Sequence, residues 1–340
     1  MLRLIIAAAT ATAVAQAAAP GRVEVLKPTG GLPASIQSKL SLPVSCAQTR
    51  AGEYLVLDRR AHTVYAIDAA RTSARQVVQI GTEKGRLLQP AAFALGADDI
   101  IAVADAPAGY ERIQLFSPTG ASLGAFVLDR RVAARLWLGP IILNGIGSMA
   151  FTGRTFVVSR PEAGALIAEL DIDGDGLRQF GALRRTGHEA DRDLHLAFNI
   201  GLPLVDPTGG FYFVFQTGRP MFRKYDAAGV LMFERHIEGV ELDAEIQTQP
   251  TSWPRRETEG GTFPLVLPVV RTAAVDPSGR LWVSLMAPVT YVYDRRGDKI
   301  RTIEFDTGAP VSPSSFFFTK DGRVLVTPGC YEFNVSGRHP

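Results

Sequence analysis

The sequence has little net charge and no long apolar run beyond its N-terminal residues. Its 340 residues include 36 Lys and Arg against 34 Asp and Glu, which gives a net charge of +2. Neither nucleic acid nor a membrane surface is therefore expected as the main partner. After the N-terminal segment, no apolar stretch approaches the length that spans a bilayer. We expect a monomer without a membrane span.

Cysteine is scarce, and Gly-rich nucleotide-binding loops are missing. No Gly-rich loop follows a strand and opens a helix, so nothing supports nucleotide binding. The only cysteines are Cys46 and Cys330, one near each end of the chain. In an oxidising compartment they can form a disulfide, and the alternative is two buried thiols.

The first residues have the pattern of a secretory signal. A short positive start, Met1–Arg3, precedes an alanine-rich apolar run, and Ala15-Gln16-Ala17 then fits a small-x-small cleavage site. The alternative is a membrane anchor, for which the run is short. We predict a signal peptide over residues 1–17 and an exported protein, periplasmic or secreted.

One stretch, Arg271–Phe305, is the clearest copy of a repeated unit. It predicts four short β-strands, with turns at Asp276–Gly279 and Asp294–Gly297. Asp caps such turns with its side chain, and Gly accepts a positive φ. Related units recur at a spacing typical of four-stranded propeller blades. We predict an all-β, six-bladed β-propeller of four-stranded antiparallel blades.

The predicted propeller forms one domain over residues 18–340. Its blades are expected over residues 43–81, 89–128, 144–182, 199–237, 269–306 and 313–336. The sixth unit lacks a fourth strand, and residues 22–26 form a lone alternating strand. We expect this N-terminal strand to complete the last blade and close the ring, which protects the sheet edges. Cys46 and Cys330 would then be neighbours across the closure.

The second unit resembles the NHL repeat. The similarity rests on Gln89-Pro90, on the strand Ile101–Asp105, and on Arg112–Gly120, which has an R-I-x-x-F-x-x-x-G pattern. The resemblance implies a six-bladed NHL-like propeller. It implies no single activity, because related propellers include protein-binding modules, lactonase-like hydrolases and amidating-type lyases. The metal-site residues of the lactonase-like propellers have no matching motif here.

Three long connections, over residues 129–144, 183–199 and 238–270, should crowd one side of the face where the central channel opens. Polar residues at strand ends are expected to surround that opening as an arginine-rich funnel for an anionic ligand or a peptide. The alternative is an ordinary solvated rim. The candidate ligand-binding residues are Asp58, Arg59, Asp105, Tyr110, Asn144, Arg160, Asn199, Arg219, Trp253 and Arg271.

Two segments suggest a metal, although we predict no cofactor. His188, Asp191 and His195 lie in one acidic stretch that we expect to be a solvated loop, with zinc binding as the alternative. Asp171–Gly176 begins like a calcium loop, but Ala182 stands where the closing glutamate belongs, so a turn is expected. The predicted function is non-catalytic binding of a protein, peptide or small anionic ligand. The alternative is a metal-assisted lyase or hydrolase at the channel mouth.

Overall fold

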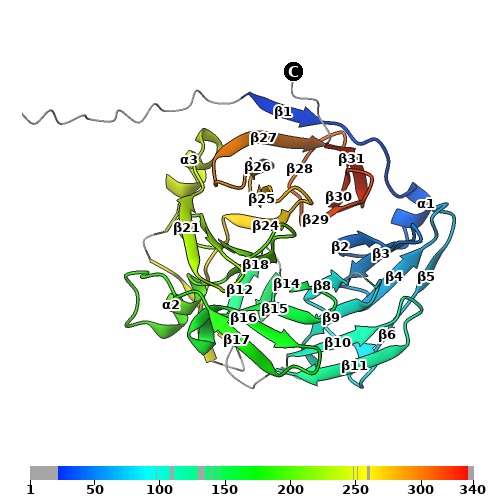
Figure 1. The fold of residues 1–340 in the computed structure, drawn as a ribbon, viewed down its shortest axis with the longest axis horizontal. Coiled ribbons are helices and arrows are strands. Elements are labelled where there is room, and N and C mark those ends of the chain that lie inside the picture. The colour runs from blue at the N-terminus through cyan, green and yellow to red at the C-terminus, as the bar shows by residue number, and fades with distance from the viewer. Residues whose placement is uncertain are drawn as a thin grey trace, which may run out of the picture.

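In the computed structural model, the described strands form six sheets of three or more strands around a central axis, together with three two-stranded sheets (Figure 1). The structure describes residues 22–96, 98–107, 111–128, 135–138, 141–144, 146–247, 249–250, 252–258 and 261–335. Within each blade, strands that follow one another along the chain lie side by side and antiparallel. The first strand of each blade lies nearest the axis. The predicted six-bladed β-propeller is confirmed.

The first three blades are built as follows. Blade 1 contains β2 (Pro43–Gln48), β3 (Tyr54–Asp58), β4 (Thr63–Ile67) and β5 (Ala74–Gln76). Blade 2 contains β8 (Ala92–Leu95), β9 (Ile101–Asp105), β10 (Arg112–Phe116) and β11 (Ser122–Val127). Blade 3 contains β14 (Met149–Phe151), β15 (Thr155–Arg160), β16 (Ala165–Asp171) and β17 (Gly176–Phe180).

The last three blades complete the ring. Blade 4 contains β18 (Gly201–Val205), β19 (Phe211–Phe215), β20 (Met221–Tyr225) and β21 (Leu231–His236). Blade 5 contains β24 (Val270–Val275), β25 (Leu281–Leu285), β26 (Thr290–Tyr293) and β27 (Lys299–Asp306). Blade 6 contains β29 (Ser315–Phe318), β30 (Arg323–Thr327) and β31 (Tyr331–Asn334).

The remaining elements lie before, between or at the edges of the blades. They are β1 (Val23–Leu26), α1 (Ala34–Gln37), β6 (Gln79–Ile80), β7 (Arg86–Leu87), β12 (Arg135–Leu138), β13 (Ile141–Asn144), the 3-10 turn η2 (Pro161–Ala163), α2 (Arg192–Ala197), α3 (Val240–Gln247), β22 (Arg255–Thr258), β23 (Gly261–Pro264) and β28 (Pro310–Val311). Each of the three long connections contains secondary structure. The first holds the β12–β13 hairpin, the second α2, and the third α3 and the β22–β23 hairpin.

The hydrophobic core lies between neighbouring blades. Along β25, alternate side chains serve opposite neighbours, as the period of two in a strand requires. Leu281 and Val283 pack in a cluster with residues of blade 4, whereas Trp282 packs with residues of blade 6. All three are fully buried. The second strand of each blade is thus enclosed on both sides, which explains its almost wholly apolar sequence.

The turns of blade 5 form as the sequence predicts. The Asp276 carboxylate accepts hydrogen bonds from the backbone N–H groups of Ser278 and Arg280, at 2.9 and 3.0 Å. Gly279 ends the same turn with a φ of 80°. A side chain there would also crowd Thr208 of blade 4. The Asp–Gly pattern therefore supplies both the turn and the close approach between blades.

The N-terminal strand closes the ring in a different way from the one predicted. The expected pairing of residues 22–26 with blade 6 is wrong, because β1 pairs in parallel with β27, the outer strand of blade 5. The long outer edge of β27 accepts it, and the Glu24 carboxylate fixes it with bonds of 2.9 Å from Arg301. Blade 6 receives the following residues instead. Thr29 donates its N–H to the Glu332 carbonyl at 2.7 Å, and Glu332 donates its N–H to the Gly30 carbonyl at 2.9 Å.

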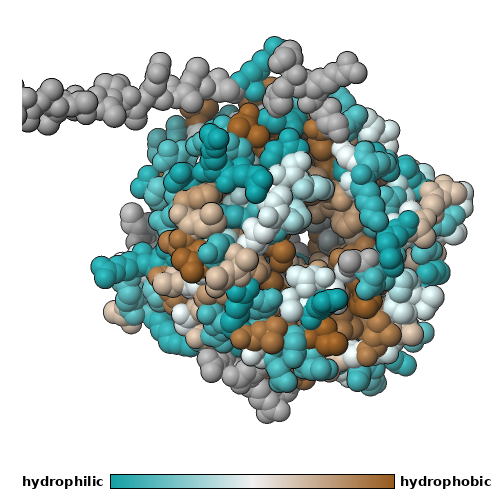
Figure 2. Space-filling view, viewed as in Figure 1, coloured by the Kyte–Doolittle hydropathy of each residue, from teal (hydrophilic) through white to brown (hydrophobic). Residues whose placement is uncertain are grey.

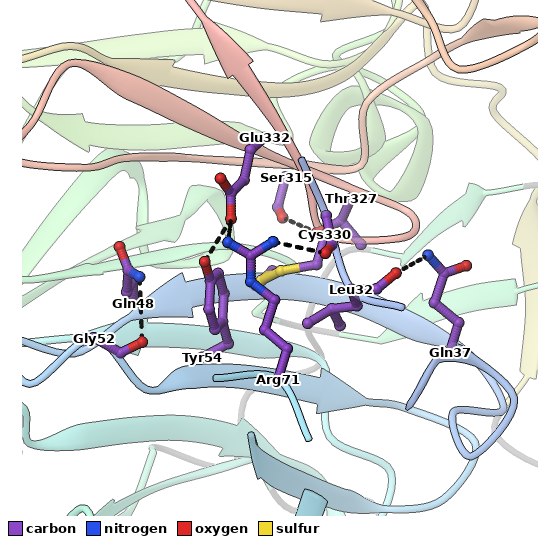
Figure 3. The surroundings of a disulfide bond; sticks show 12 residues. Leu32, Gln37, Gln48, Gly52, Tyr54, Arg71, Ser315, Thr327, Cys330 and Glu332 are labelled. Carbon is purple, nitrogen blue, oxygen red and sulfur yellow. Dashed lines mark hydrogen bonds and ion pairs between the residues drawn. A yellow bond between two sulfur atoms is a disulfide. The ribbon is translucent and has the colours of Figure 1, made fainter. Parts of the chain in front are cut away.

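The predicted disulfide is confirmed at the ring closure. Cys46 of blade 1 is bonded to Cys330 of blade 6, with 5.9 Å between their Cα atoms. Figure 3 shows Tyr54 and Arg71 converging on Glu332 beside the disulfide. The Tyr54 hydroxyl donates to the Glu332 carboxylate at 2.5 Å, and an Arg71 nitrogen lies 2.6 Å from it. A covalent bond and a buried polar network therefore join the first and last blades.

Two expectations concern the chain as a whole. Among the described residues, no helix is long and apolar enough to cross a membrane. The predicted signal peptide, residues 1–17, lies outside the described residues.

Candidate ligand site on the channel face

At one end of the ring, the second strand of each blade connects to the third, and each blade connects to the next. We call this end the channel face. Because neighbouring strands are antiparallel, all these connections meet at one end of the propeller. α2 and α3 lie in blade-to-blade connections and therefore belong to this face. Figure 2 shows apolar residues interspersed with hydrophilic ones on the side that it presents, rather than one large patch of either kind.

Arg271 lies where β24 leaves the channel face and begins to line the channel. The ladder between β24 and β25 shifts register between Val270 and Thr272, so Arg271 is the extra residue of a β-bulge. Its side chain is partly buried, and it makes no hydrogen bond or ion pair within the described part of the chain. Burial lowers the pKa of its guanidinium. Bulges often redirect a side chain next to a binding site.

The two predicted aspartates are buried and have backbone partners. Asp58 accepts hydrogen bonds from the N–H groups of Leu42 and Ala61, at 3.0 and 2.9 Å, and is fully buried. Asp105 accepts from the Leu88 N–H at 3.0 Å and from the Arg112 guanidinium at 2.7 Å. Both carboxylates hold connections of the channel face in place. Neither has a side-chain surface that faces a ligand, since their exposed fractions are 0% and 2%.

Two of the predicted arginines already have partners in the chain. Arg59 donates to the carbonyls of Pro90 and Ala91, at 3.1 and 2.8 Å, and burial lowers its pKa to about 10. It thus joins the β3–β4 connection of blade 1 to the residues that precede β8 of blade 2. Arg160 forms a buried ion pair with Glu162 in η2. Both guanidinium groups therefore help to hold the connections of the face in place.

Asn199 and Arg184 are hydrogen-bonded to each other and hold the residues on either side of α2 together. The Asn199 side chain accepts from the Arg184 N–H at 2.8 Å and donates to the His195 carbonyl at 3.0 Å. It is fully buried. The Arg184 guanidinium donates to the carbonyls of Phe198 and Thr217, and burial lowers its pKa to about 10. The structure therefore gives Asn199 a structural role in positioning the long connection.

Arg219 lies at the rim, beside a pocket of about 520 Å³ between blade 4 and α3. It pairs loosely with Glu238 at 3.7 Å, and both side chains are about 70% exposed, at 68% and 73%. The pocket is lined by Gly218, Arg219, Ile237, Glu238, Gly239, Asp243, Ile246 and Gln249. Exposed pairs of this kind contribute little stability.

The suggested metal ligands each have another partner. The sequence predicts a loop here, but Asp191 caps the short helix α2 and pairs with Arg255. His195 lies 2.8 Å from the Thr186 hydroxyl, and the His188 ring stacks on Phe198. Among the described residues, no group of three or more His, Cys, Asp or Glu is placed to hold a metal ion.

Three further predicted segments have simpler outcomes. Trp253 packs edge-on against Phe198, with 5.1 Å between the ring centroids, and so anchors the third long connection to the second. Tyr110 and the side chain of Asn144 lie outside the described residues. The Asp171 carboxylate accepts from the N–H groups of Asp173 and Asp175, as in an ordinary turn.

A serine with hydrolase-like spacing lies away from the channel face. Residues 120–124, GASLG, match the G-x-S-x-G pattern, in which the serine sits between a strand and a helix. Here Ser122 is exposed at the start of the outer strand β11, at the opposite end of blade 2. It therefore lacks the setting of an activated nucleophile.

Two residues of interest were not identified from sequence. Glu111 accepts a hydrogen bond from the Ile146 N–H at 2.6 Å, and burial raises its pKa to about 7. Gln216 follows β19 and is 3% exposed, although its side-chain amide makes no hydrogen bond within the described residues. The one sequence signal for Gln216 is a polar residue directly after the apolar run of β19, F-Y-F-V-F.

Comparisons with known proteins identify the fold and nothing finer. No protein-family model matches the chain, and a search of curated protein sequences finds no match. The structure is similar to a PQQ-bound aldose sugar dehydrogenase from Streptomyces coelicolor, with a TM-score of 0.54, 13% identity, and 93% and 98% of the two chains covered. It is also similar to virginiamycin B lyase from Staphylococcus aureus, with a TM-score of 0.51, 10% identity, and coverage of 87% and 85%. At such low identity the likeness shows the propeller fold alone.

Proposed function

We propose that this protein is an exported NHL-like propeller that binds an anionic ligand at the channel mouth without catalysing a reaction. Arg271 carries the proposal. It is a partly buried cation with no acidic partner within the described residues, at a bulge in a channel-lining strand. A buried charge without a partner costs stability, which favours a role in binding for this residue.

The other polar groups of the face favour binding over metal-assisted catalysis. His188 and His195 are engaged in stacking and in a contact with Thr186, and Asp191 caps a helix. Asp58 and Asp105 hold backbone N–H groups and so have no free proton-transfer role. What remains available is a donor, the Arg271 guanidinium, which suits carboxylate or phosphate groups.

Export is supported by two independent features. The N-terminal residues have the pattern of a secretory signal. The disulfide at the ring closure is the kind of bond that persists in an oxidising compartment.

The test replaces Arg271 with methionine, which keeps much of its apolar volume and removes the charge. Without ligand, Arg271→Met should raise the free energy of unfolding by about 1 kcal/mol, because an unpaired and partly buried charge is removed. The wild type should show a saturable rise in Tm with acetate or inorganic phosphate at fixed ionic strength, and the variant should not. The matched control is Arg219→Gln, since Arg219 lies on the same face but is exposed and paired.

The proposal requires that Arg271→Met and Arg219→Gln differ in their effect on anion binding. If Arg219→Gln abolishes anion binding as fully as Arg271→Met does, the anions respond to general surface charge and the proposed site is wrong. A wild type that shows no saturable response to either anion also contradicts it.

A further inference from the structure

We propose that Gln216 and Arg271 form a subsite for a single carboxylate group. This inference rests on the proposed function and names the ligand class. Gln216 directly follows β19 of blade 4, and Arg271 lies in the first strand of blade 5. The two residues therefore face the same junction between blades, at the channel face.

The backbone holds Gln216 beside the bulge. Its carbonyl accepts hydrogen bonds from the N–H groups of Val269 and Val270, at 2.8 and 3.2 Å. Its own N–H donates to the Ile200 carbonyl at 3.1 Å. The residue that precedes Arg271 is thus bonded directly to Gln216, and three main-chain bonds fix the position of the glutamine without using its side chain.

The Gln216 side chain is directed toward blade 5 by the alternation of β19. Phe213 and Phe215 pack in a cluster with residues of blade 3, whereas Tyr212 and Val214 pack in the cluster shared with blade 5. The Gln216 N–H continues the ladder with blade 4's first strand, so the alternation places Gln216 on the side of Tyr212 and Val214.

The Gln216 amide is buried but still reachable. The residue is 3% exposed, and its amide makes no hydrogen bond with a described residue. Its small remaining exposed surface is where a ligand would reach it. A buried amide with no partner among the described residues favours a partner supplied by a ligand, which is the second sign of the site.

The donor set suits a carboxylate better than a phosphate dianion. The planar guanidinium of Arg271 offers parallel N–H donors that match the two oxygens of a carboxylate. The amide of Gln216 adds two N–H donors and no charge. The pair therefore carries a single positive charge, which balances one carboxylate but leaves half the charge of a phosphate dianion uncompensated. Such a carboxylate can belong to a small acid or to a peptide C-terminus.

The experiment measures binding of acetate, benzoate and inorganic phosphate by calorimetry at fixed ionic strength. Wild type should bind the two carboxylates more tightly than phosphate. Gln216→Met, which keeps the backbone bonds and the volume, should weaken carboxylate binding about 10-fold, the effect of one hydrogen bond to a charged group. Gln216→Glu, of nearly the same shape, should abolish binding by repulsion. Arg271→Lys should weaken carboxylate binding as well, because the charge remains but the two parallel N–H donors of the guanidinium are lost.

The outcomes separate this inference from the proposed function. If phosphate binds more tightly than the carboxylates, or if Gln216→Met binds like wild type while Arg271→Met does not bind, the carboxylate subsite is wrong and the anion site stands. If no anion binds in a way that depends on Arg271, both are wrong. Unchanged Tm and circular dichroism of Gln216→Met, together with the Arg219→Gln control, exclude misfolding and general charge effects as causes.

Discussion

The Cys46–Cys330 disulfide should be a large single contribution to the stability of this propeller, because it closes a very long loop. The two residues are 284 positions apart in sequence. In the chain-entropy relation a loop of this length removes about 5.6 kcal/mol of unfolded-state entropy at 25 °C, and native disulfides deliver about 2 to 5 kcal/mol when removed. We expect a loss of about 4 kcal/mol for Cys46→Ala/Cys330→Ala.

The same loss can be expressed as a change in Tm. At about 2.1 cal/mol/K per residue, a chain of 340 residues unfolds with an entropy of roughly 0.7 kcal/mol/K, so a loss of about 4 kcal/mol lowers Tm by roughly 6 °C. Part of the loss in the double variant is a packing effect, because both cysteines lie in an apolar cluster with Leu32, Ile36 and Leu325. Reduced wild-type protein separates the two contributions, since it keeps both sulfur atoms in place.

The assay is urea unfolding and thermal unfolding of three samples: oxidised wild type, reduced wild type and the double variant. Reduction alone should produce most of the loss, and the double variant should lose slightly more. If reduced and oxidised wild type unfold within about 0.5 kcal/mol of each other, the loop-closure argument is refuted. If only the double variant is destabilised, the loss belongs to packing and not to the bond.

Two further predictions concern buried charges on the channel face. Asp105→Asn should cost about 3 to 5 kcal/mol, because it leaves the buried Arg112 guanidinium without its charged partner; a Tm equal to that of wild type would contradict this. Burial raises the pKa of Glu111 from 4.5 to about 7, so the folded state holds this proton more tightly than the unfolded state does. Its contribution to stability is therefore present below the unfolded pKa and is lost as pH rises through the folded pKa. Glu111→Gln keeps an acceptor for the Ile146 N–H and should flatten the Tm profile between about pH 5 and pH 8. At the upper end of this range the variant should be about 1 to 3 kcal/mol more stable than wild type. Parallel Tm profiles of the two proteins would refute the pKa shift.

Turn chemistry made the propeller predictable from sequence, because the turn residues that mark each blade act locally. The Asp276 carboxylate accepts hydrogen bonds from N–H groups close to it in sequence, and the turn needs a glycine three residues later. The pattern is therefore visible in a short stretch of sequence. The partner of β1 was not predictable in this way. The outer edges of blades 5 and 6 are both open to an added strand, and the deciding ion pair joins Glu24 to Arg301, which are 277 positions apart. Long-range pairing of this kind leaves no local pattern.

The candidate site was harder to predict, since sequence does not reveal whether a polar side chain is already satisfied. Asp58 and Arg59 look like binding residues at a strand end, yet their partners are backbone groups of adjoining connections. The helix α2 was missed for a related reason, because its cap, Asp191, lies in a short polar stretch with no long apolar period. Only the packed structure shows that the Gln216 amide has no partner among the described residues.

The arginines of the channel face differ in the use of their donors rather than in their charge. Arg59 and Arg184 are as deeply buried as Arg271 or more so, and burial lowers the pKa of all three. Arg59 and Arg184 donate hydrogen bonds to carbonyl groups of neighbouring connections. Such bonds rigidify the face without neutralising its charge. Their positive charges therefore add to the field at the face, and Arg271 is the one of the three with no hydrogen bond to a described residue. Structural arginines thus add positive potential at the channel mouth, and in the proposed site the donors for an anion lie at the bulge of blade 5.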